Sequence, residues 1–145
     1  MRGVNSAFED AFNLFCGEVI GRGMSRTVYS SPVLPDCVIK VETDSGRFQN
    51  ILEAELWDRV KYTEHAKWFA PVRYLSPNGQ ILVMEKTTPA PTSALPEKMP
   101  AFLTDFKRGN YGLLNGKFVC HDYGLHLMLE RGMTKAMQKV PHWND

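Results

Sequence analysis

The sequence predicts an α+β fold in which short strands, several of them joined as hairpins, are combined with a longer helix. Short runs rich in β-branched and aromatic residues alternate with turns that contain glycine, proline or asparagine, which is typical of strands joined as hairpins. One longer segment, between residues 47 and 67, instead repeats its apolar residues at helical spacing. The 145 residues are enough for one domain with one hydrophobic core.

The first 42 residues predict a helix followed by three strands. Ser6 and Glu9 form a capping-box pattern, and the apolar residues after Ser6 predict a short amphipathic helix that ends at about Phe15. The stretch 17–31, GEVIGRGMSRTVYSS, predicts a strand, a tight loop and a second strand, and CVIKVE at 37–42 predicts a third. These pieces suggest an antiparallel meander.

The middle of the chain predicts one helix and two further strands. Apolar residues recur at helical spacing from about Arg47 to Lys67, after the helix-starting residues 43–45. Strands are then expected at 72–75 and 81–84, on either side of Asn78-Gly79, a dipeptide that favours a hairpin turn with positive φ.

The last third of the chain predicts a linker, a hairpin and a helix. Four of the nine prolines fall within 87–100, so this stretch predicts a hinge or linker. Strands at 111–114 and 117–121 flank Asn115-Gly116, and a helix is expected from about Glu130 to Val140. Its basic residues Arg131, Lys135 and Lys139 form a stripe that is either a docking surface or a solvated helix face. We therefore expect one domain, 1–145, made of an N-terminal segment over residues 1–86, a linker over 87–100 and a C-terminal segment over 101–145.

Composition and charge exclude several classes of protein. The formal net charge of +1 gives no overall field that attracts nucleic acid. No apolar run approaches the roughly 18 residues of a membrane span, and Glu9 and Asp10 argue against a signal peptide, so a cytoplasmic protein is expected. The three cysteines and four histidines show no metal-ligand spacing, which predicts small core cysteines and no zinc site.

Two motifs in the N-terminal segment suggest a phosphate site. Gly21 and Gly23 lie between two predicted strands, where glycines let backbone amides approach a polyanion; a plain tight hairpin is the alternative. Lys40 lies in a strand with apolar neighbours, so a buried ammonium there needs a partner, for which Glu53 and Glu55 on the next helix are candidates. The alternative for Lys40 is a solvated edge strand.

Two motifs in the C-terminal segment suggest a loop that holds a metal and a phosphate; for residues 103–110 an ordinary polar turn is the alternative. The stretch 103–110, LTDFKRGN, brings together Asp105, Lys107 and Asn110, and Asp122 ends a hydrophobic strand just before Tyr123-Gly124. A carboxylate at a strand end is well placed for Mg²⁺, which binds few carboxylates and keeps phosphate oxygens as ligands.

In chain order these motifs resemble the protein kinase signature set, over roughly residues 18–124. They are G-x-G followed by Val28, V-I-K ending at Lys40, a helix glutamate, M-E at 84–85, D-x-K-x-x-N at 105–110 and D-Y-G at 122–124. The chain is thus similar to a minimal serine/threonine kinase-like protein of the kind encoded by bacteriophages and bacteria. The resemblance implies a kinase-like fold with a five-stranded antiparallel small lobe, an αC helix and a much reduced large lobe.

The resemblance implies a nucleotide site in the small lobe. Gly21, Gly23 and Val28 would belong to the glycine-rich loop over the ATP phosphates, and Lys40 would bind the α- and β-phosphates. Glu53 best fits the helix partner of Lys40, with Glu55 as the alternative. Two further residues would border the adenine, Met84 as gatekeeper and Glu85 as the start of the hinge.

The resemblance also implies the roles of the second set of residues. Asp105 would be the catalytic aspartate, and Lys107, whose spacing is that of serine/threonine kinases, would neutralise the γ-phosphate. Asn110 and Asp122 would hold Mg²⁺. The chain departs from the family pattern at Arg26, which replaces a third glycine and would stiffen the loop or add a phosphate contact. It departs again at Leu103-Thr104, where these kinases usually have the His-Arg pair that anchors a phosphorylated activation loop.

Two functions follow as hypotheses. The first is an ATP- and Mg²⁺-dependent phosphotransferase of the serine/threonine protein kinase type, acting on a protein. The second is a kinase-like binding module, weak or inactive in catalysis, that docks to a host protein, because the helices of a peptide-binding platform are missing from the sequence. For a phage-encoded chain either would act in the host cytoplasm.

Overall fold

The computed structural model describes residues 4–43, 46–124 and 132–145, and these divide into two compact units. The first unit is formed by Met1–Ile51 and Val72–Lys86, and the second by Leu52–Pro71 and Thr87–Asp145. Helix α2, Gln49–Val60, begins in the first unit and continues in the second.

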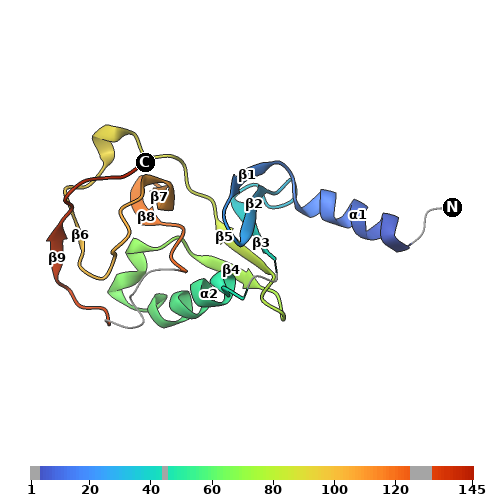
Figure 1. Ribbon diagram of the computed structural model, residues 1–145, viewed down its shortest axis with the longest axis horizontal. Coiled ribbons are helices and arrows are strands. Elements are labelled where there is room, and N and C mark those ends of the chain that lie inside the picture. The colour runs from blue at the N-terminus through green and yellow to red at the C-terminus, as the bar shows by residue number, and fades with distance from the viewer. Residues whose placement is uncertain (1–3, 44–45, 125–131) are drawn as a thin grey trace. The chain divides into compact units, whose positions relative to one another are not determined.

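The first unit contains the predicted five-stranded antiparallel sheet, in the order β1-β2-β3-β5-β4 (Figure 1). Its neighbours pair antiparallel throughout. The strands are β1 Val19–Arg22, β2 Arg26–Ser30, β3 Cys37–Glu42, β4 Val72–Leu75 and β5 Ile81–Glu85. All five strand predictions are confirmed, and the mixed α and β character of the fold is confirmed with them.

A small apolar core supports one face of this sheet. Cys16, Ile39 and Val83 are buried together, and partly buried residues pack against them: Phe15, Tyr29, Cys37, Val41 and Ile81. Helix α1, Val4–Phe15, joins this unit through an edge-to-face contact between Phe12 and Tyr29, whose ring centroids lie 5.6 Å apart. The predicted helix is confirmed and starts slightly earlier than expected.

The predicted helix over 47–67 is shorter than expected, because both of its ends are set by local backbone geometry. Phe48 has a φ of 54°, outside the helical region, and α2 begins only at Gln49. Thr63 is extended and its hydroxyl accepts a hydrogen bond from the His65 amide, which starts the separate 3₁₀ turn η1, Glu64–Trp68.

The second unit contains two small antiparallel ladders. β7, Tyr111–Leu114, and β8, Lys117–Cys120, form the predicted hairpin, in which Asn115 and Gly116 both have positive φ. β6, Lys98–Pro100, pairs with β9, Met137–Lys139, from the far end of the sequence (Figure 1). The proline-rich stretch is therefore partly ordered, since it contains β6 and the 3₁₀ turn η2, Thr92–Ala94.

The predicted helix over 130–140 is wrong in the residues that the structure describes there. Residues 137–139 are a strand, and the Thr134 hydroxyl accepts from the Ala136 amide, a local bond that competes with helix formation. The Val140 amide donates to the carbonyl of Glu97, next to β6. This hydrogen bond replaces the one that the same amide would make inside a helix. Lys135 and Lys139 therefore do not share a helix face, and Arg131 lies outside the described residues.

The cysteines are free, as predicted from their spacing. Cys16 and Cys120 are buried, Cys37 is partly buried, and burial raises the pKa of the Cys16 and Cys37 thiols. In the part of the chain that is described, none of the helices has the length and apolar character needed to traverse a bilayer.

Candidate active site

Three of the residues predicted to bind a nucleotide form one row across the sheet of the first unit. Gly21 pairs with Val28 across β1 and β2, and Val28 pairs with Lys40 across β2 and β3. β3 is the central strand, and Lys40 is 3% exposed. The edge-strand alternative for Lys40 is therefore wrong, because the strand that contains Lys40 is hydrogen-bonded to a neighbouring strand on each side.

The conformation of the β1–β2 hairpin does not require its glycines. Neither Gly21 nor Gly23 has a positive φ, and a Cβ at either position would meet only ordinary contacts, at 3.8 Å from Val28 and 3.7 Å from Arg26. The Gly23 amide donates to the Arg26 carbonyl and closes the turn. Because glycine has no side chain, a ligand can approach the backbone closely at both positions.

Arg26 turns into the unit and joins a buried polar network. Its guanidinium donates to the Asn50 side-chain oxygen at 2.9 Å, and Arg26 is 6% exposed. Glu42 accepts from the amides of Gln49 and Asn50, so its carboxylate caps the start of α2. Ser25 donates to Gln49 at 2.7 Å. Of the two roles expected for Arg26, these contacts favour the stiffened loop.

Asn50 is the centre of this network and is fully buried. Its amide nitrogen lies within hydrogen-bonding distance of the carbonyl oxygens of Lys40, Gly79 and Gln80. We expect Asn50→Ala to lower the free energy of unfolding by about 3 kcal/mol, because the buried groups that bond to the Asn50 side chain would lose their hydrogen-bond partner. Urea denaturation followed by circular dichroism measures this, with Asn13→Ala on the exposed face of α1 as a control that stays within about 0.5 kcal/mol of the wild type.

The remaining predicted residues of the first unit lie on β5. Met84 is fully buried and pairs with Val38 and Val72. Glu85 is the last residue of the strand, and its carboxylate lies 3.2 Å from the Arg73 guanidinium. The Lys86 amide then donates to the Asp36 carbonyl, which fixes the exit of the chain from this unit.

In the second unit, the structure brings Asp105 and Asn110 into direct contact. The Asn110 side-chain nitrogen donates to Asp105 Oδ2 at 2.9 Å. The turn between them is a short 3₁₀ element, η3, Arg108–Asn110, in which the Asn110 amide donates to the Lys107 carbonyl. Asp105 and Lys107 are exposed, while Asn110 is buried, so the loop presents a carboxylate and an ammonium group to solvent.

Asp122 is joined to the same loop through the backbone. The Asn110 carbonyl accepts from the amide of His121 at 2.8 Å and from the amide of Asp122 at 3.3 Å. The His121 ring adds a second tie, with Nε2 lying 2.6 Å from the Gly109 carbonyl and Nδ1 lying 2.6 Å from the Thr87 hydroxyl. Since a carbonyl only accepts, Nε2 carries the proton and, in a neutral ring, the Thr87 hydroxyl donates to Nδ1.

Tyr111 supports Asp105 through the backbone. Its hydroxyl donates to the Asp105 carbonyl at 2.8 Å, and its ring stacks on Phe118. Burial raises the pKa of the Tyr111 hydroxyl well above its ordinary value, and the neighbouring Cys120 and Asp105 add to this. The hydroxyl therefore stays protonated, and it remains a donor over the whole ordinary pH range.

Glu53 fixes the residues that follow Asp122. The Glu53 side chain is fully buried, and its Oε2 accepts from the amides of Tyr123 at 2.9 Å and Gly124 at 3.1 Å. Tyr123 is held further by its hydroxyl, which donates to the Ala70 carbonyl, and by an edge-to-face contact with Phe69. Glu55, the alternative to Glu53, is exposed on the same helix.

The predicted site residues thus fall into two groups. The structure gathers Glu53, Asp105, Lys107, Asn110 and Asp122 within the second unit, whereas the first unit contains Gly21, Gly23, Val28, Lys40, Met84 and Glu85. Sequence reasoning missed His121, Tyr111 and the segment 140–145. His121 and Tyr111 stand next to Asp122 and Asn110, and this adjacency was the one signal that could have pointed to them.

The donor set at Asn110 and Asp122 fits Mg²⁺ better than a transition metal. Because Asn110 uses its side-chain nitrogen to donate to Asp105, its side-chain oxygen is the atom that could bind a cation, and Asp122 would add a carboxylate. Two oxygen ligands, with substrate phosphates completing the shell, are typical of Mg²⁺. Among the described residues, no cluster of three or more His, Cys, Asp or Glu side chains offers a different metal site.

Each unit has a cavity that is lined by its own residues. The smaller lies beside the start of α2 and is lined by Glu42, Thr43, Gly46, Phe48, Ile51, Asn78, Gly79 and Gln80. The larger, of about 640 Å³, is lined by Thr92, Leu95, Pro96, Glu97, Arg108, Lys139, Val140, Trp143 and Asp145. Asp105, Asn110 and Asp122 do not line either of these two cavities.

Comparison with known proteins adds one structural likeness. No protein-family model matches the chain, and no curated protein matches it either. Among solved structures, the chain is similar to the ternary complex of streptomycin and ATP with APH(2″)-IIa, at a TM-score of 0.43 and 17% sequence identity. The match covers 62% of this chain and 30% of that one, so the chain spans less than a third of that structure. A likeness of this extent assigns neither a ligand nor a reaction to the chain.

Proposed function

We propose that the chain is an ATP- and Mg²⁺-dependent phosphotransferase of the serine/threonine protein kinase type. The observation that carries this proposal is the hydrogen-bonded arrangement of the second unit. Asn110 joins Asp105 through its side chain and Asp122 through its carbonyl, and Glu53 holds the two amides after Asp122. A base, a metal-binding pair and a support for that pair therefore lie on one continuous set of contacts.

The proposed roles follow from the chemistry of each group. Asp105 takes the proton of a substrate hydroxyl as the hydroxyl oxygen forms its bond to the γ-phosphorus. The bond between that phosphorus and the bridging oxygen breaks, and ADP leaves with the electron pair. Lys107, which is exposed beside Asp105, compensates the charge of the transferring phosphoryl group. When bound by Asn110 and Asp122, Mg²⁺ would supply charge neutralisation at the phosphate oxygens.

The first unit would hold the nucleotide. Gly21 and Gly23 carry no side chains on the β1–β2 hairpin, and Val28 and Lys40 continue the cross-strand row that begins at Gly21. We assign the phosphates to this row, with Lys40 as their cation. The adenine would lie beside Met84 and Glu85 at the end of β5, where the chain leaves the unit.

A second candidate function, a kinase-like binding module, is favoured by one specific observation. Helix α1 exposes the large apolar side chains of Phe8, Phe12 and Leu14, which are 68%, 44% and 62% exposed. Exposed apolar side chains on one short helix are typical of a surface that docks to another protein. This function requires neither Asp105 nor Asp122, so the two hypotheses predict different results for the same variants.

The test of the proposed function is the binding and transfer of phosphate by Asp122→Asn. We expect the wild type to bind ATP with Mg²⁺ by calorimetry and to transfer labelled phosphate to itself or to a protein acceptor. Asp122→Asn should lower that transfer at least about 100-fold, because it removes the charged metal ligand. With the metal chelated, the wild type and the variant should bind ATP equally weakly.

Asp58→Asn is the matched control, because Asp58 is exposed on α2 and its carboxylate pairs with the neighbouring Lys61 on the surface. It should leave both binding and transfer unchanged. Absence of ATP binding by the wild type would reject the phosphotransferase, and retention of a protein partner by Asp122→Asn would then support the binding module.

A further inference from the structure

The segment Val140–Asp145 is bonded to the loop that carries Asp105 and Lys107. The Asn144 amide donates to the Phe106 carbonyl at 2.9 Å, and the Arg108 amide donates to the Asn144 carbonyl at 2.7 Å. These two bonds form a parallel bridge between Lys107 and Asn144. They fix the backbone on both sides of Lys107 and do not involve the Lys107 side chain.

Trp143 anchors this segment. Its indole nitrogen donates to the Pro96 carbonyl at 2.9 Å, which ties it to the proline-rich stretch. Its ring makes edge-to-face contacts with three aromatic residues, at centroid distances of 5.2 to 5.6 Å: Phe106, Tyr111 and Phe118. Tyr111 is also the residue whose hydroxyl donates to the Asp105 carbonyl. Trp143 therefore packs against two side chains that hold or belong to the loop.

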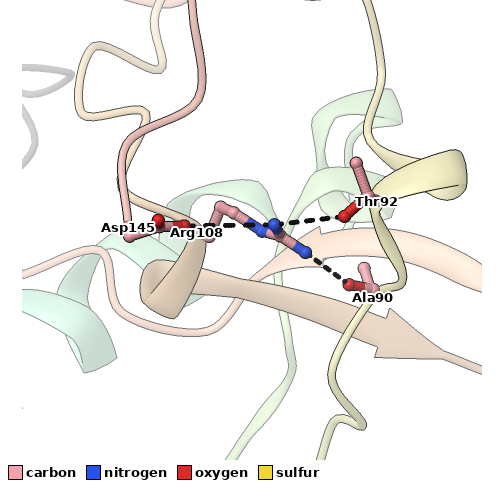
Figure 2. Close-up of polar contacts among 4 residues, drawn as sticks. All are labelled: Ala90, Thr92, Arg108 and Asp145. Atoms are coloured by element: carbon pink, nitrogen blue, oxygen red, sulfur yellow. Dashed lines mark hydrogen bonds and ion pairs between the residues drawn. The ribbon is translucent and has the colours of Figure 1, made fainter.

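Arg108 extends the same connection to the proline-rich stretch (Figure 2). Its guanidinium donates to the Ala90 carbonyl at 3.2 Å and to the Thr92 hydroxyl at 3.3 Å, and it lies 4.0 Å from the Asp145 carboxylate. Asp145 is 98% exposed, so this ion pair adds little. The two hydrogen bonds and the bridge to Asn144 carry the connection.

The loop alternates between two faces, and the segment contacts one of them. Asp105 and Lys107 are exposed, whereas Phe106 and Arg108 are half-buried, and Lys107 has the extended angles φ −78° and ψ 123°. In extended backbone, successive side chains point to opposite sides. The side chains held by Trp143, Ala90 and Thr92 are those of Phe106 and Arg108, which flank the extended Lys107, so the Lys107 side chain points the opposite way; Asp105 is exposed as well.

We propose that Trp143 and Asn144 are positioning residues for phosphoryl transfer, which hold the inner face of the loop so that Asp105 and Lys107 point at the reacting groups. This inference rests on the proposed function. It assigns a mechanistic task to a segment that acts through the backbone and the inner side chains of the loop.

Asn144→Pro tests this proposal, because proline lacks the amide that donates to the Phe106 carbonyl. Asn144→Ala is the matched control, since it removes the side chain and keeps both backbone bonds. We expect Asn144→Pro to lower kcat about 10-fold or more while KM for ATP stays within about twofold, because a misplaced base affects the reaction more than nucleotide binding. Hydrogen exchange at the amides of Arg108 and Asn110 should become faster in the proline variant alone.

The exchange measurement separates this inference from the proposed function. If the wild type transfers no phosphate, the proposed function is wrong, and faster exchange confined to Asn144→Pro still supports a loop ordered by the segment. Unchanged exchange would overturn the inference, and so would an unchanged kcat in an active enzyme whose loop exchange has risen.

Trp143 provides a second pair of variants if Asn144→Pro does not fold. Trp143→Phe keeps an aromatic ring among Phe106, Tyr111 and Phe118, and Trp143→Ala removes it. We expect kcat to fall in the order wild type, Trp143→Phe, Trp143→Ala, with KM for ATP again nearly constant. A parallel rise in KM, or equal kcat in both variants, would reject a positioning role.

Discussion

Replacing Asp105 by asparagine is expected to lower the rate of phosphoryl transfer by about 100- to 10,000-fold, the usual contribution of a general base. The substitution keeps the shape of the loop, because an asparagine oxygen can still accept from the Asn110 side chain as Asp105 Oδ2 does at 2.9 Å. It removes the basicity of the carboxylate. The Tyr111 bond to the backbone carbonyl of residue 105 is unaffected.

The measurement is the initial rate of phosphate transfer from labelled ATP, together with the affinity for ATP and Mg²⁺ by calorimetry. We expect the rate to fall and the affinity to stay the same, since Asp105 contacts the acceptor and not the nucleotide in the proposed reaction. Asp36→Asn, whose side chain is exposed in the first unit, is the control. Transfer by Asp105→Asn at the wild-type rate would show that another group is the base.

Replacing Glu53 by leucine is expected to lower the free energy of unfolding by about 3 kcal/mol or more and to abolish Mg²⁺-dependent ATP binding. The physical reason is that Glu53 Oε2 accepts from the amides of both Tyr123 and Gly124, in a fully buried position. Leucine leaves both amides without this acceptor, and each unsatisfied buried donor costs about 1 to 3 kcal/mol. The backbone that carries Asp122 would then lose its support.

Glutamine at position 53 separates hydrogen bonding from charge. Because both bonds end on one oxygen, a glutamine oxygen can accept both, so we expect a smaller loss of stability, about 1 kcal/mol. Glu55→Leu is the control on the exposed side of the same helix and should change stability by less than about 0.5 kcal/mol. Denaturant unfolding and calorimetry with ATP and Mg²⁺ give both readings. Equal effects at positions 53 and 55 would contradict the role of Glu53.

The sheet could be predicted because most of its pairings are formed by neighbours in the sequence. Gly79 and Gly116 both have positive φ in their turns, as Asn-Gly dipeptides predict, and each turn joins two strands that lie side by side. The pairing of β3 with β5 connects distant strands, and the apolar character of both strands already indicated burial. Local chemistry was therefore sufficient for most of the fold.

The end of the chain could not be predicted for the opposite reason. The hydrogen-bonding partner of β9 is β6, with Lys98 paired to Lys139, and nothing local indicates this pairing. Without a partner in view, the spacing of the apolar residues 133, 136, 137 and 140 favoured a helix. Met137 is 50% exposed, so this apolar spacing did not reflect a buried face.

For the candidate site, the types of residue could be read from the sequence, whereas the contacts that hold those residues could not. The identities of Asp105, Asn110 and Asp122 were visible in the sequence, and the loop geometry that joins them is in keeping with that prediction. Their roles stay predictions until activity is measured. The contacts that hold them could not be foreseen, since Glu53 lies 70 positions before Tyr123 and Trp143 lies 47 positions after Pro96.

The alternation of faces along residues 105–108 makes the spacing of this loop as restrictive as its composition. Inserting one residue between Thr104 and Asp105 would move each loop residue by one position against the segment Val140–Asp145, so that Asp105 takes the place of Phe106 and Phe106 takes that of Lys107. Phe106 would then turn to solvent, and the Asp105 carboxylate would meet the aromatic ring of Trp143. Such an insertion would keep every residue of the loop and still misplace the base of the proposed reaction. Related chains that share this architecture should therefore vary in the amino acids of the loop more readily than in its length.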